Sequence, residues 1–226
     1  SSAETGGLKK GDVILAVNGL AIDSRGNYMH PDYGKLSFSH VVRGDAKVGD
    51  TITLDLIRDR EPLTLEIELK RKRPEDFLVD PYMYDRGPKY VIFGGLIFQE
   101  LTRPYLKSWG DEWVNRAPFR LVHANANPEE WEKQDRDKLV FLSNVLKTPS
   151  TLGYENLSSV IVSEVNGKFI KNINDLAEAF QEVPGDGIHV IEFVDYPKVI
   201  YVDDRASQFV NQQLIQYGIG QLRRLD

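Results

Sequence analysis

The side chains that could carry out catalysis are few and stand in unrelated contexts. The chain has no cysteine, and no serine lies in a Gly-Asp-Ser-Gly turn or a Gly-x-Ser-x-Gly elbow. Hydrolysis by a serine nucleophile needs a base that a third group orients, together with backbone donors for the oxyanion. No such set can be named, so we expect no catalytic residue. The four histidines are His30, His40, His123 and His189.

Metal and cofactor sites have little support either. The histidines show no His-x-x-x-His or Glu-x-x-His spacing, which argues against a zinc site. Asp203 and Asp204 could bind a cation, but we favour a solvated turn for them. Residues 93–96 (FGGL) are too short for a phosphate loop, and no Lys-Ser/Thr follows them. We expect no metal and no cofactor, and we expect His189 to be half-buried or at the surface of a strand.

The composition is that of a globular protein with one large or two modest domains. The chain has 226 residues, of which 41% are hydrophobic and 27% charged, and its net charge is −6. This charge argues against general binding to nucleic acid or anionic lipid. No apolar run is long enough to span a membrane. No Met-plus-basic start with an apolar h-region appears, so we expect any targeting signal to lie outside this chain. A chain without cysteine is compatible with oxidising and reducing compartments alike.

Two stretches of the chain nearly repeat each other. Residues 12–19 (DVILAVNG) and 160–167 (VIVSEVNG) are β-branched strands that end in Val-Asn-Gly. Asn-Gly favours a tight turn because both residues tolerate a positive φ. A helical segment, a Gly-Asp pair and a strand follow each stretch in the same order, which favours a repeat over a chance match.

The pattern after each Asn-Gly predicts the remaining elements of the repeat. In the second copy we expect a helix over 174–182 with Asn174 as its N-cap, and a strand over 188–194. In the first copy we expect a short helix and two alternating antiparallel strands joined by a turn. Their ranges are 36–43 for the helix, 49–58 and 63–69 for the strands, and 59–62 for the turn.

This order of elements resembles a PDZ domain. Residues 7–19 (GLKKGDVILAVNG) are similar to the PDZ domains of Do/HtrA-type serine proteases. Residues 90–102 (YVIFGGLIFQELT) and 153–155 (GYE) resemble the C-terminal PDZ-like domain of bacterial and plant Do-like proteases. The resemblance covers nearly the whole chain. It implies an α+β fold with two PDZ-like units, each a small, mostly antiparallel, partly open β-barrel with short helices.

The resemblance also implies a domain organisation. We expect a first unit over 1–72, a linker over 73–88 and a second unit over 89–226 with an insertion at about 102–137. The strand-like run 138–146 has no counterpart in the first unit. We therefore expect the first unit to be truncated at its N-terminus with an exposed or borrowed strand edge, and a trypsin-like protease domain to precede it in the parent protein.

Three segments of the second unit are expected to pack on its surface. Residues 104–114 predict an amphipathic helix, residues 128–136 a polar cap that contains Trp131, and residues 206–215 a last helix. The apolar side chains of the first are Tyr105, Leu106, Trp109 and Trp113. The side chains of the last that we expect to face inward are Phe209, Val210, Leu214 and Tyr217.

The basic run at 70–76 is expected to be a solvated strand end and linker. A nuclear signal or a nucleic-acid patch would also use such residues, but the acidic net charge argues against both.

The resemblance points to peptide binding as the chemistry of the second unit. PDZ domains add a chain end as an extra strand to a sheet edge, while consecutive N–H groups hold its carboxylate. Gly94-Gly95, before a strand at 96–101, suits such a loop, and the helix at 174–182 would face it. Alternatively, the glycines make a bulge and the protein's own residues fill the groove. The expected peptide-binding residues are Phe93, Gly94, Gly95, Leu96, Ile97, Phe98, Ala177, Phe180 and Gln181.

Two functions from different classes follow. The first is a non-catalytic regulatory region of a Do-like serine endopeptidase that recognises peptide termini or unfolded chains by strand addition. The alternative is an oligomer-assembly or docking module with occluded grooves. The implied partners are peptide or unfolded-protein segments, sister subunits of a homo-oligomer and the upstream protease domain, with no nucleic acid. The location is unknown, and periplasmic or cell-envelope if the bacterial resemblance holds.

Overall fold

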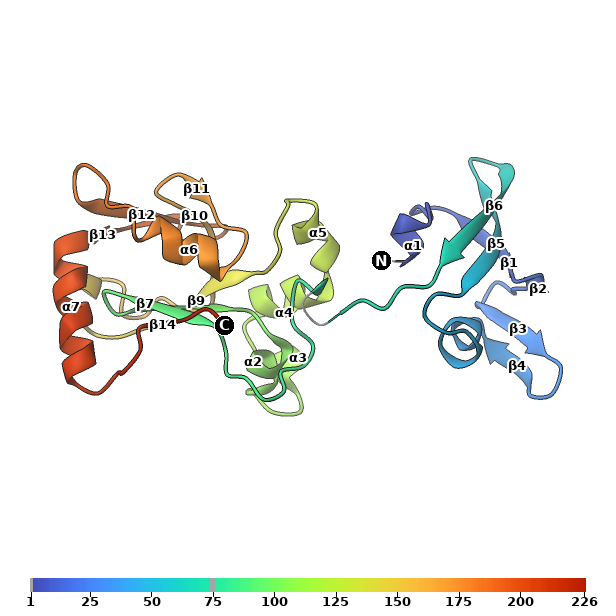
Figure 1. Ribbon diagram of the computed structural model, residues 1–226, viewed down its shortest axis with the longest axis horizontal. Coiled ribbons are helices and arrows are strands. Elements are labelled where there is room, and N and C mark those ends of the chain that lie inside the picture. Colours follow the sequence, from blue (N-terminus) through green and yellow to red (C-terminus); the bar gives the residue numbers. More distant parts are fainter. Residues whose placement is uncertain (1, 74–75) are drawn as a thin grey trace. The chain divides into compact units, whose positions relative to one another are not determined.

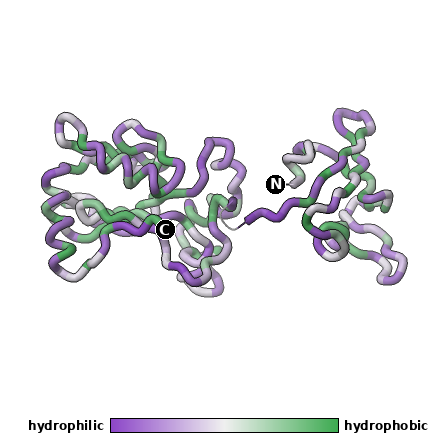
Figure 2. Tube along the Cα trace, viewed as in Figure 1, coloured by the Kyte–Doolittle hydropathy of each residue, from purple (hydrophilic) through white to green (hydrophobic). Residues whose placement is uncertain are grey.

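The chain folds into two compact units, Ser1–Arg73 and Pro74–Asp226, called the first and the second unit below. The structure is a computed structural model that describes residues 2–73 and 76–226. Each unit combines antiparallel strands with short helices (Figure 1). Apolar residues gather on the strands, and hydrophilic residues on the loops and on the stretch at 70–73 (Figure 2). The expected α+β class and the two units are confirmed.

The first unit is built on a four-stranded antiparallel sheet in the order β2-β1-β5-β6. A separate hairpin of β3 and β4 and a short π-helix (Val41–Asp45) lie between β2 and β5 in sequence. The remaining elements are α1 (Ser2–Thr5), β1 (Val13–Val17), β2 (Leu20–Ala21), β3 (Asn27–His30), β4 (Gly34–Ser37), β5 (Thr51–Arg58) and β6 (Glu61–Glu68).

The Asn-Gly turns explain why the two repeats fold alike. Asn18 lies between β1 and β2 at a φ of 49°, and its side-chain oxygen accepts a hydrogen bond from Thr53 N at 2.9 Å. Asn166 lies at a φ of 53° in the second unit, and its side-chain oxygen accepts one from Val190 N at 3.0 Å. Each asparagine therefore makes the turn and also ties it to the neighbouring strand, which confirms the repeat.

The first unit differs from the prediction in one segment. The residues expected to form a helix at 36–43 begin as strand β4, which ends at Ser37, and are helical from Ser39 onward, with the π-helix at Val41–Asp45. The two later strands are confirmed, since β5 and β6 pair along their full length. The turn between them covers only 59–60 and not the expected 59–62, because β6 begins at Glu61. Among the described residues, neither β2 nor β6 pairs with a further strand on its outer side, so this sheet does not close into a barrel.

The second unit contains one long antiparallel sheet in the order β13-β12-β10-β9-β8-β7-β14, with β11 paired to β10. Its strands are β7 (Tyr90–Phe93), β8 (Leu96–Glu100), β9 (Val140–Val145), β10 (Val160–Val165), β11 (Lys168–Phe169), β12 (Ile188–Phe193), β13 (Val199–Asp203) and β14 (Arg223–Arg224). Its helices are α2 (Arg103–Lys107), α3 (Trp113–Arg116), α4 (Phe119–Ala126), α5 (Pro128–Glu132), a 3-10 turn (Pro149–Thr151), α6 (Ile173–Ala179) and α7 (Asp204–Gln216).

Two apolar cores hold this unit together. The larger core packs the inner face of the sheet against α6, and it includes Phe98, Val162 and Leu176. The other core packs α2, α4 and α5 on the opposite face through residues such as Leu106, Leu121 and Phe141. The helices α2 to α5 fall within the expected insertion at 102–137. They pack on one face of the sheet through this second core, which is called the insertion core below.

The insertion departs from the prediction in two places. The helix expected over 104–114 is broken into α2 and α3, because Gly110 between them has a φ of +89° that ends the first helix. Trp109 and Trp113 are half-buried against the insertion core. Trp131, expected in a polar surface cap, is buried in the same core with 9% of its surface exposed.

The segment before β7 also packs on the second unit. Leu78 and Val79 are buried in the insertion core. The carboxylate of Asp80 pairs with Lys138 and, at 2.9 Å, with Arg86, and its backbone oxygen accepts from Arg103 N. These contacts fall within the stretch 73–88 that was expected to be a linker, so the packed part of the second unit begins near Leu78.

The last helix, α7, is present but its buried face was predicted wrongly. Val210 is buried and Leu214 half-buried, but Phe209 is 59% and Tyr217 82% exposed. The buried side chains next to Val210 are instead the polar Ser207 and Asn211. Polar residues face inward here because they contact a backbone turn, as described below.

Candidate peptide-binding groove

The groove side chains come from β7 and from helix α6, which packs against β7 and β8 (Figure 1). The helix starts at Asn172, whose side-chain oxygen accepts hydrogen bonds from the backbone N–H groups of Asn174 and Asp175. The expected N-cap, Asn174, is therefore two residues too late. Glu100 adds a second cap, because its carboxylate accepts from Ile173 N at 3.2 Å. Its pKa is raised by burial.

Gly94 and Gly95 form the tight turn between β7 and β8, where Phe93 pairs with Leu96. Their φ values of +58° and +100° are left-handed, which glycine adopts without strain. Gly94 N donates to the side-chain oxygen of Asn211 on α7 at 2.9 Å. The amide that was expected to hold a carboxylate is thus already bonded within the protein, and the buried polar face of α7 serves this turn.

Strand β8 has no free edge for an added strand. It pairs with β7 on one side and with β9 on the other. Leu96 and Phe98 are fully buried in the larger core, and Ile97 is half-buried. These three residues therefore support the sheet from within, and the strand that could accept a partner along its edge is β7 and not β8.

The other predicted residues do come together. Phe93, Ala177, Phe180 and Gln181 line one cavity of about 360 Å³ between β7, α6 and α7. The rings of Phe93 and Phe180 stack with their centroids 4.3 Å apart. Of the nine predicted residues, these four share the cavity, whereas the two turn glycines and the three β8 residues do not line it.

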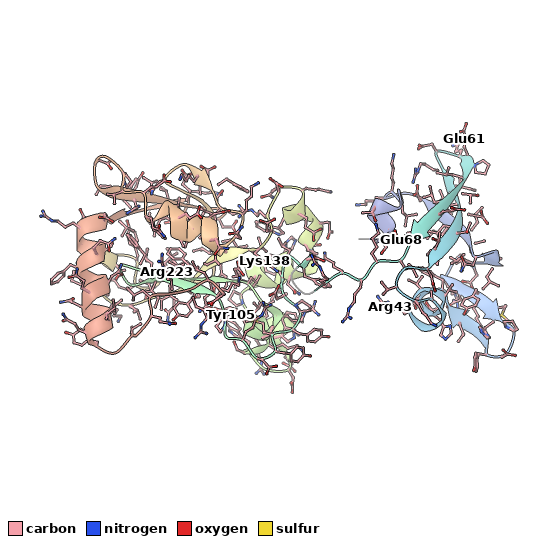
Figure 3. The ribbon with its side chains drawn as sticks, in the orientation of Figure 1. Arg43, Glu61, Glu68, Tyr105, Lys138 and Arg223 are labelled. Carbon is pink, nitrogen blue, oxygen red and sulfur yellow. The ribbon has the colours of Figure 1, made fainter. Side chains whose placement is uncertain are left out.

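The outer edge of β7 is held by the chain's own C-terminal strand, β14. Ile92 N donates to Leu222 O at 2.7 Å, and the register places Arg223 opposite Val91 and Arg224 opposite Tyr90. Figure 3 labels Arg223 beside β7. Sequence reasoning did not find this strand, because two arginines in a short segment carry no strand periodicity.

Further contacts hold β14 in place. The Arg224 guanidinium lies 5.6 Å from the centre of the Tyr90 ring, and Leu225 packs against the larger core. A Cβ added to Gly87 would lie 1.9 Å from Arg224 Nη1, the flexible end of a side chain, so a larger residue at position 87 would displace the guanidinium. The segment before β7 therefore lies close to the strand that pairs with β7.

A buried histidine ties the walls of the groove to α7. His189 is fully buried, which corrects the expectation of a half-buried or surface residue. Its Nδ1 accepts from the Asn166 amide at 2.9 Å, and its Nε2 donates to Asp204 at 3.1 Å. Its ring makes edge contacts with Phe93 and Phe180. One imidazole ring thus links the Asn-Gly turn, the groove aromatics and the start of α7.

The paired aspartates at the start of α7 have protein partners. Asp203 accepts from Ala206 N at 2.7 Å as the N-cap of α7, and Asp204 bonds His189. In the part of the chain that the structure describes, no three His, Cys, Asp or Glu side chains gather in an arrangement that could hold a metal ion. None of the described helices is long and apolar enough for a membrane crossing.

Comparison with known proteins bears directly on this architecture. The PDZ domain family is matched twice, over residues 79–224 and over residues 1–69. Both matches are to PDZ domains and neither is to a catalytic domain. The first match alone covers more than half of the chain, and it contains β7, α6, α7 and β14.

Curated relatives carry protease names. The "Protease Do-like 2, chloroplastic" of Arabidopsis thaliana is 28% identical over 221 residues, which is 97% of this chain and 34% of that protein. The "Putative protease Do-like 3, mitochondrial" of the same plant is 26% identical over 92% of this chain and 34% of its own length. The "Serine protease DegP homolog" of Plasmodium falciparum is 27% identical over 77% of this chain and 19% of its own length.

The chain thus spans between a fifth and about a third of the length of these relatives. Two PDZ matches in tandem, the repeated Asn-Gly turn and similarity along nearly the whole chain agree with one another. The chain therefore belongs to the PDZ domain family and is a tandem of two PDZ domains of the kind found in Do-like, HtrA-type proteases.

Proposed function

We propose that this PDZ region binds extended peptide segments, by adding them as a strand to β7, and so regulates a Do-like serine endopeptidase of which it is a part. One observation carries the proposal. The edge of β7 already pairs with an extended segment, β14, in antiparallel register and with the Ile92–Leu222 hydrogen bond at 2.7 Å. Backbone pairing of this kind gives affinity, and side-chain pockets along it give specificity.

The direction of β14 supports binding of a peptide through the backbone of β7 rather than through the Gly94-Gly95 turn. β14 runs antiparallel to β7, so its C-terminal end lies beside Tyr90 and its N-terminal end beside the Gly94-Gly95 turn. Since Gly94 N is bonded to Asn211, a competing strand would obtain its hydrogen bonds from the β7 backbone. Unfolded protein segments, which offer free backbone groups, are the partners that this edge suits.

Peptide binding can be measured by fluorescence anisotropy with a labelled peptide of residues 218–226 (GIGQLRRLD). The Leu225→Asp variant places a charge where Leu225 contacts the core, so it weakens the internal strand and should bind the peptide more tightly than the unchanged chain. Phe209→Asp, at an exposed position of α7, is the control. The absence of saturable binding to Leu225→Asp at high micromolar peptide would reject the proposal.

The same strand also favours a second candidate. If β14 is never displaced, the groove is occluded and the region serves as an assembly or docking module. Light scattering, which measures the oligomeric state of the chain, separates the peptide-binding proposal from the docking proposal. An oligomer that Leu225→Asp leaves intact, together with no peptide binding, supports the docking role, whereas a monomer that binds peptide supports the first proposal.

A further inference from the structure

Two Asn-Gly pairs occur in the chain, and they share the same local chemistry. Each follows a valine, at Asn18-Gly19 and at Asn166-Gly167. Glycine has no Cβ to shield its backbone nitrogen, so this nitrogen can reach the side-chain carbonyl carbon of the asparagine before it. In water this attack converts asparagine into aspartate or isoaspartate. Because the sequence around the two pairs is so similar, a large difference in their reactivity has to come from the fold.

The backbone of the two turns is also alike. The φ angle is 49° at Asn18 and 53° at Asn166, and it is 76° and 75° at the glycines that follow them. Each asparagine exchanges hydrogen bonds with one residue of the neighbouring strand, which is Thr53 in the first unit and Val190 in the second. The bond to the side-chain oxygen has to open in both turns before the glycine nitrogen can attack, so it favours neither turn.

The side-chain nitrogens of the two asparagines differ. Asn166 Nδ2 donates to Ala179 O, at the end of α6, at 3.0 Å and to His189 Nδ1 at 2.9 Å. Asn18 Nδ2 has no hydrogen-bond partner among the residues that the structure describes. The residue that corresponds to His189 in the first unit is Ile52, because each precedes the strand residue that bonds the turn. Isoleucine offers no acceptor, so the first turn lacks this restraint.

The surroundings of Asn18 also leave room for the reaction. Asn18 is exposed, whereas Asn166 is half-buried. Together with Leu20, Asn18 lines a cavity of about 570 Å³ in the first unit, which is large enough to admit water. The side chain of Asn18 is released when one hydrogen bond, from Thr53 N, opens. The side chain of Asn166 has to give up three.

We propose that Asn18 is a site of spontaneous deamidation and that the fold protects Asn166 from the same reaction. The backbone nitrogen of Gly19 attacks Cγ of Asn18, so a new Cγ–N bond forms and the Cγ–Nδ2 bond breaks. Ammonia leaves with the proton of the glycine nitrogen. Water then opens the cyclic imide at either carbonyl and gives aspartate or isoaspartate. Each product adds a negative charge to the first unit.

The isoaspartate product changes the link between the turn and β5. Its main chain runs through Cγ, so the oxygen that accepts from Thr53 N becomes a backbone carbonyl and leaves its place. The turn next to the Val17–Leu20 pair also gains a methylene group. Deamidation therefore loosens the first unit as the molecule ages. Hydrogen exchange of the Thr53 amide, followed by NMR, should be faster in the isoaspartate form, and unchanged exchange would contradict this consequence.

The test follows both turns in one sample of the full chain. The folded chain is kept in mildly alkaline buffer and digested with trypsin at intervals. Mass spectrometry with fragmentation then measures the conversion of the amide to a carboxyl group in peptides 11–25 and 148–168, which contain Asn18 and Asn166. The two additional hydrogen bonds of Asn166 should make its reaction about tenfold slower than that of Asn18. Equal rates in the folded chain, or a faster rate at Asn166, would overturn the proposal.

Urea and one variant separate the effect of the fold from that of the sequence. In urea both turns are unfolded, so the two rates should become similar, and a tenfold difference that persists there would reject protection by the fold. His189→Ile gives the second unit the residue that the first unit has at the corresponding position, and it removes one acceptor of Asn166 Nδ2. This variant should speed the reaction at Asn166 several-fold and leave the rate at Asn18 unchanged. An unchanged rate at Asn166 in the folded variant would count against the proposal.

Discussion

The backbone nitrogen of Ile92 donates to the carbonyl oxygen of Leu222 at 2.7 Å, and this bond joins the edge of β7 to a segment near the end of the chain. The edge of a sheet is where a PDZ domain takes an extended partner. The chain supplies its own partner there, through the pairs Val91–Arg223 and Tyr90–Arg224. Under the proposed function, a peptide would therefore have to compete with β14 for this edge.

The turn glycine Gly94 should tolerate no side chain. A Cβ at this position would lie 2.4 Å from Ser207 Oγ, and its φ of +58° is left-handed. Gly94→Ala is expected to lower the free energy of unfolding by about 1–2 kcal/mol from the backbone conformation, and by a further ~1–3 kcal/mol from crowding against α7. Gly167 has a φ of +75° and open space around it, so Gly167→Ala should lose only the stability that the backbone conformation accounts for.

Tryptophan fluorescence measures this difference, because all three tryptophans lie in the second unit. Urea midpoints that are equal for the two glycine variants would show that α7 does not pack on the turn as described.

The ion pair of Asp12 and Arg58 should make the first unit sensitive to acid. The Arg58 hydrogen bonds, at 2.6 and 2.8 Å, lower the pKa of Asp12 to about 2 from its usual 3.8. A carboxylate with a depressed pKa stabilises the fold above its unfolded pKa, and this stabilisation is lost as the pH falls through the folded value. The free energy of unfolding of the first unit should therefore fall between about pH 4 and pH 2.

Amide signals of β1 and β5 in NMR spectra report this transition in the first unit alone. Asp12→Asn should be less stable at pH 7 and show a weaker dependence on pH in the acid range. A slope equal to that of the unchanged chain would argue against the ion pair as its cause. Asp23→Asn is the comparison, since the Lys35 ion pair likewise lowers the pKa of Asp23 to about 2.

Glu100 should respond to pH in the opposite sense. Burial raises the pKa of its carboxyl, so the folded state favours the protonated form. The stability that this group contributes is complete below its unfolded pKa and is lost as the pH rises through the folded value. Glu100→Gln keeps an oxygen for Ile173 N and removes the charge, so it should raise the free energy of unfolding at pH 7, with a smaller gain at pH 4.

Thermal unfolding of the second unit, followed by tryptophan fluorescence at the two pH values, measures this effect. A loss of stability at pH 7 would mean that the ionised carboxylate is required at the start of α6.

Local patterns predicted much of the fold, because they depend on residues close in sequence. The turn at Asn166-Gly167 and the pairing of β5 with β6 follow from turn chemistry and alternation. The site depended on distant partners. The same Gly94-Gly95 pair suits a carboxylate loop and a tight hairpin turn, and only the bond to Asn211, 117 residues away, decides between them.

The burial of polar residues also depended on partners that are distant in the sequence. His189 alternates with apolar neighbours in a strand, which left its exposure open. It is buried because Asn166 and Asp204, from two other elements, satisfy both ring nitrogens. The inward face of α7 was misread for a related reason, since Ser207 and Asn211 are polar residues that pack on the Gly94 turn.

A reversible disulfide across β7 and β14 tests the central claim most directly. Tyr90 and Arg224 are opposite each other, and hydrogen-bonded partners of this kind have Cα atoms about 5.5 Å apart, which a disulfide can span. The chain has no other cysteine, so Tyr90→Cys with Arg224→Cys forms one defined bond. Peptide binding to this double variant is then measured in its oxidised and reduced forms. The account predicts that the oxidised form binds no peptide and that reduction restores binding. Equal binding in both forms would show that peptides do not enter at the edge of β7.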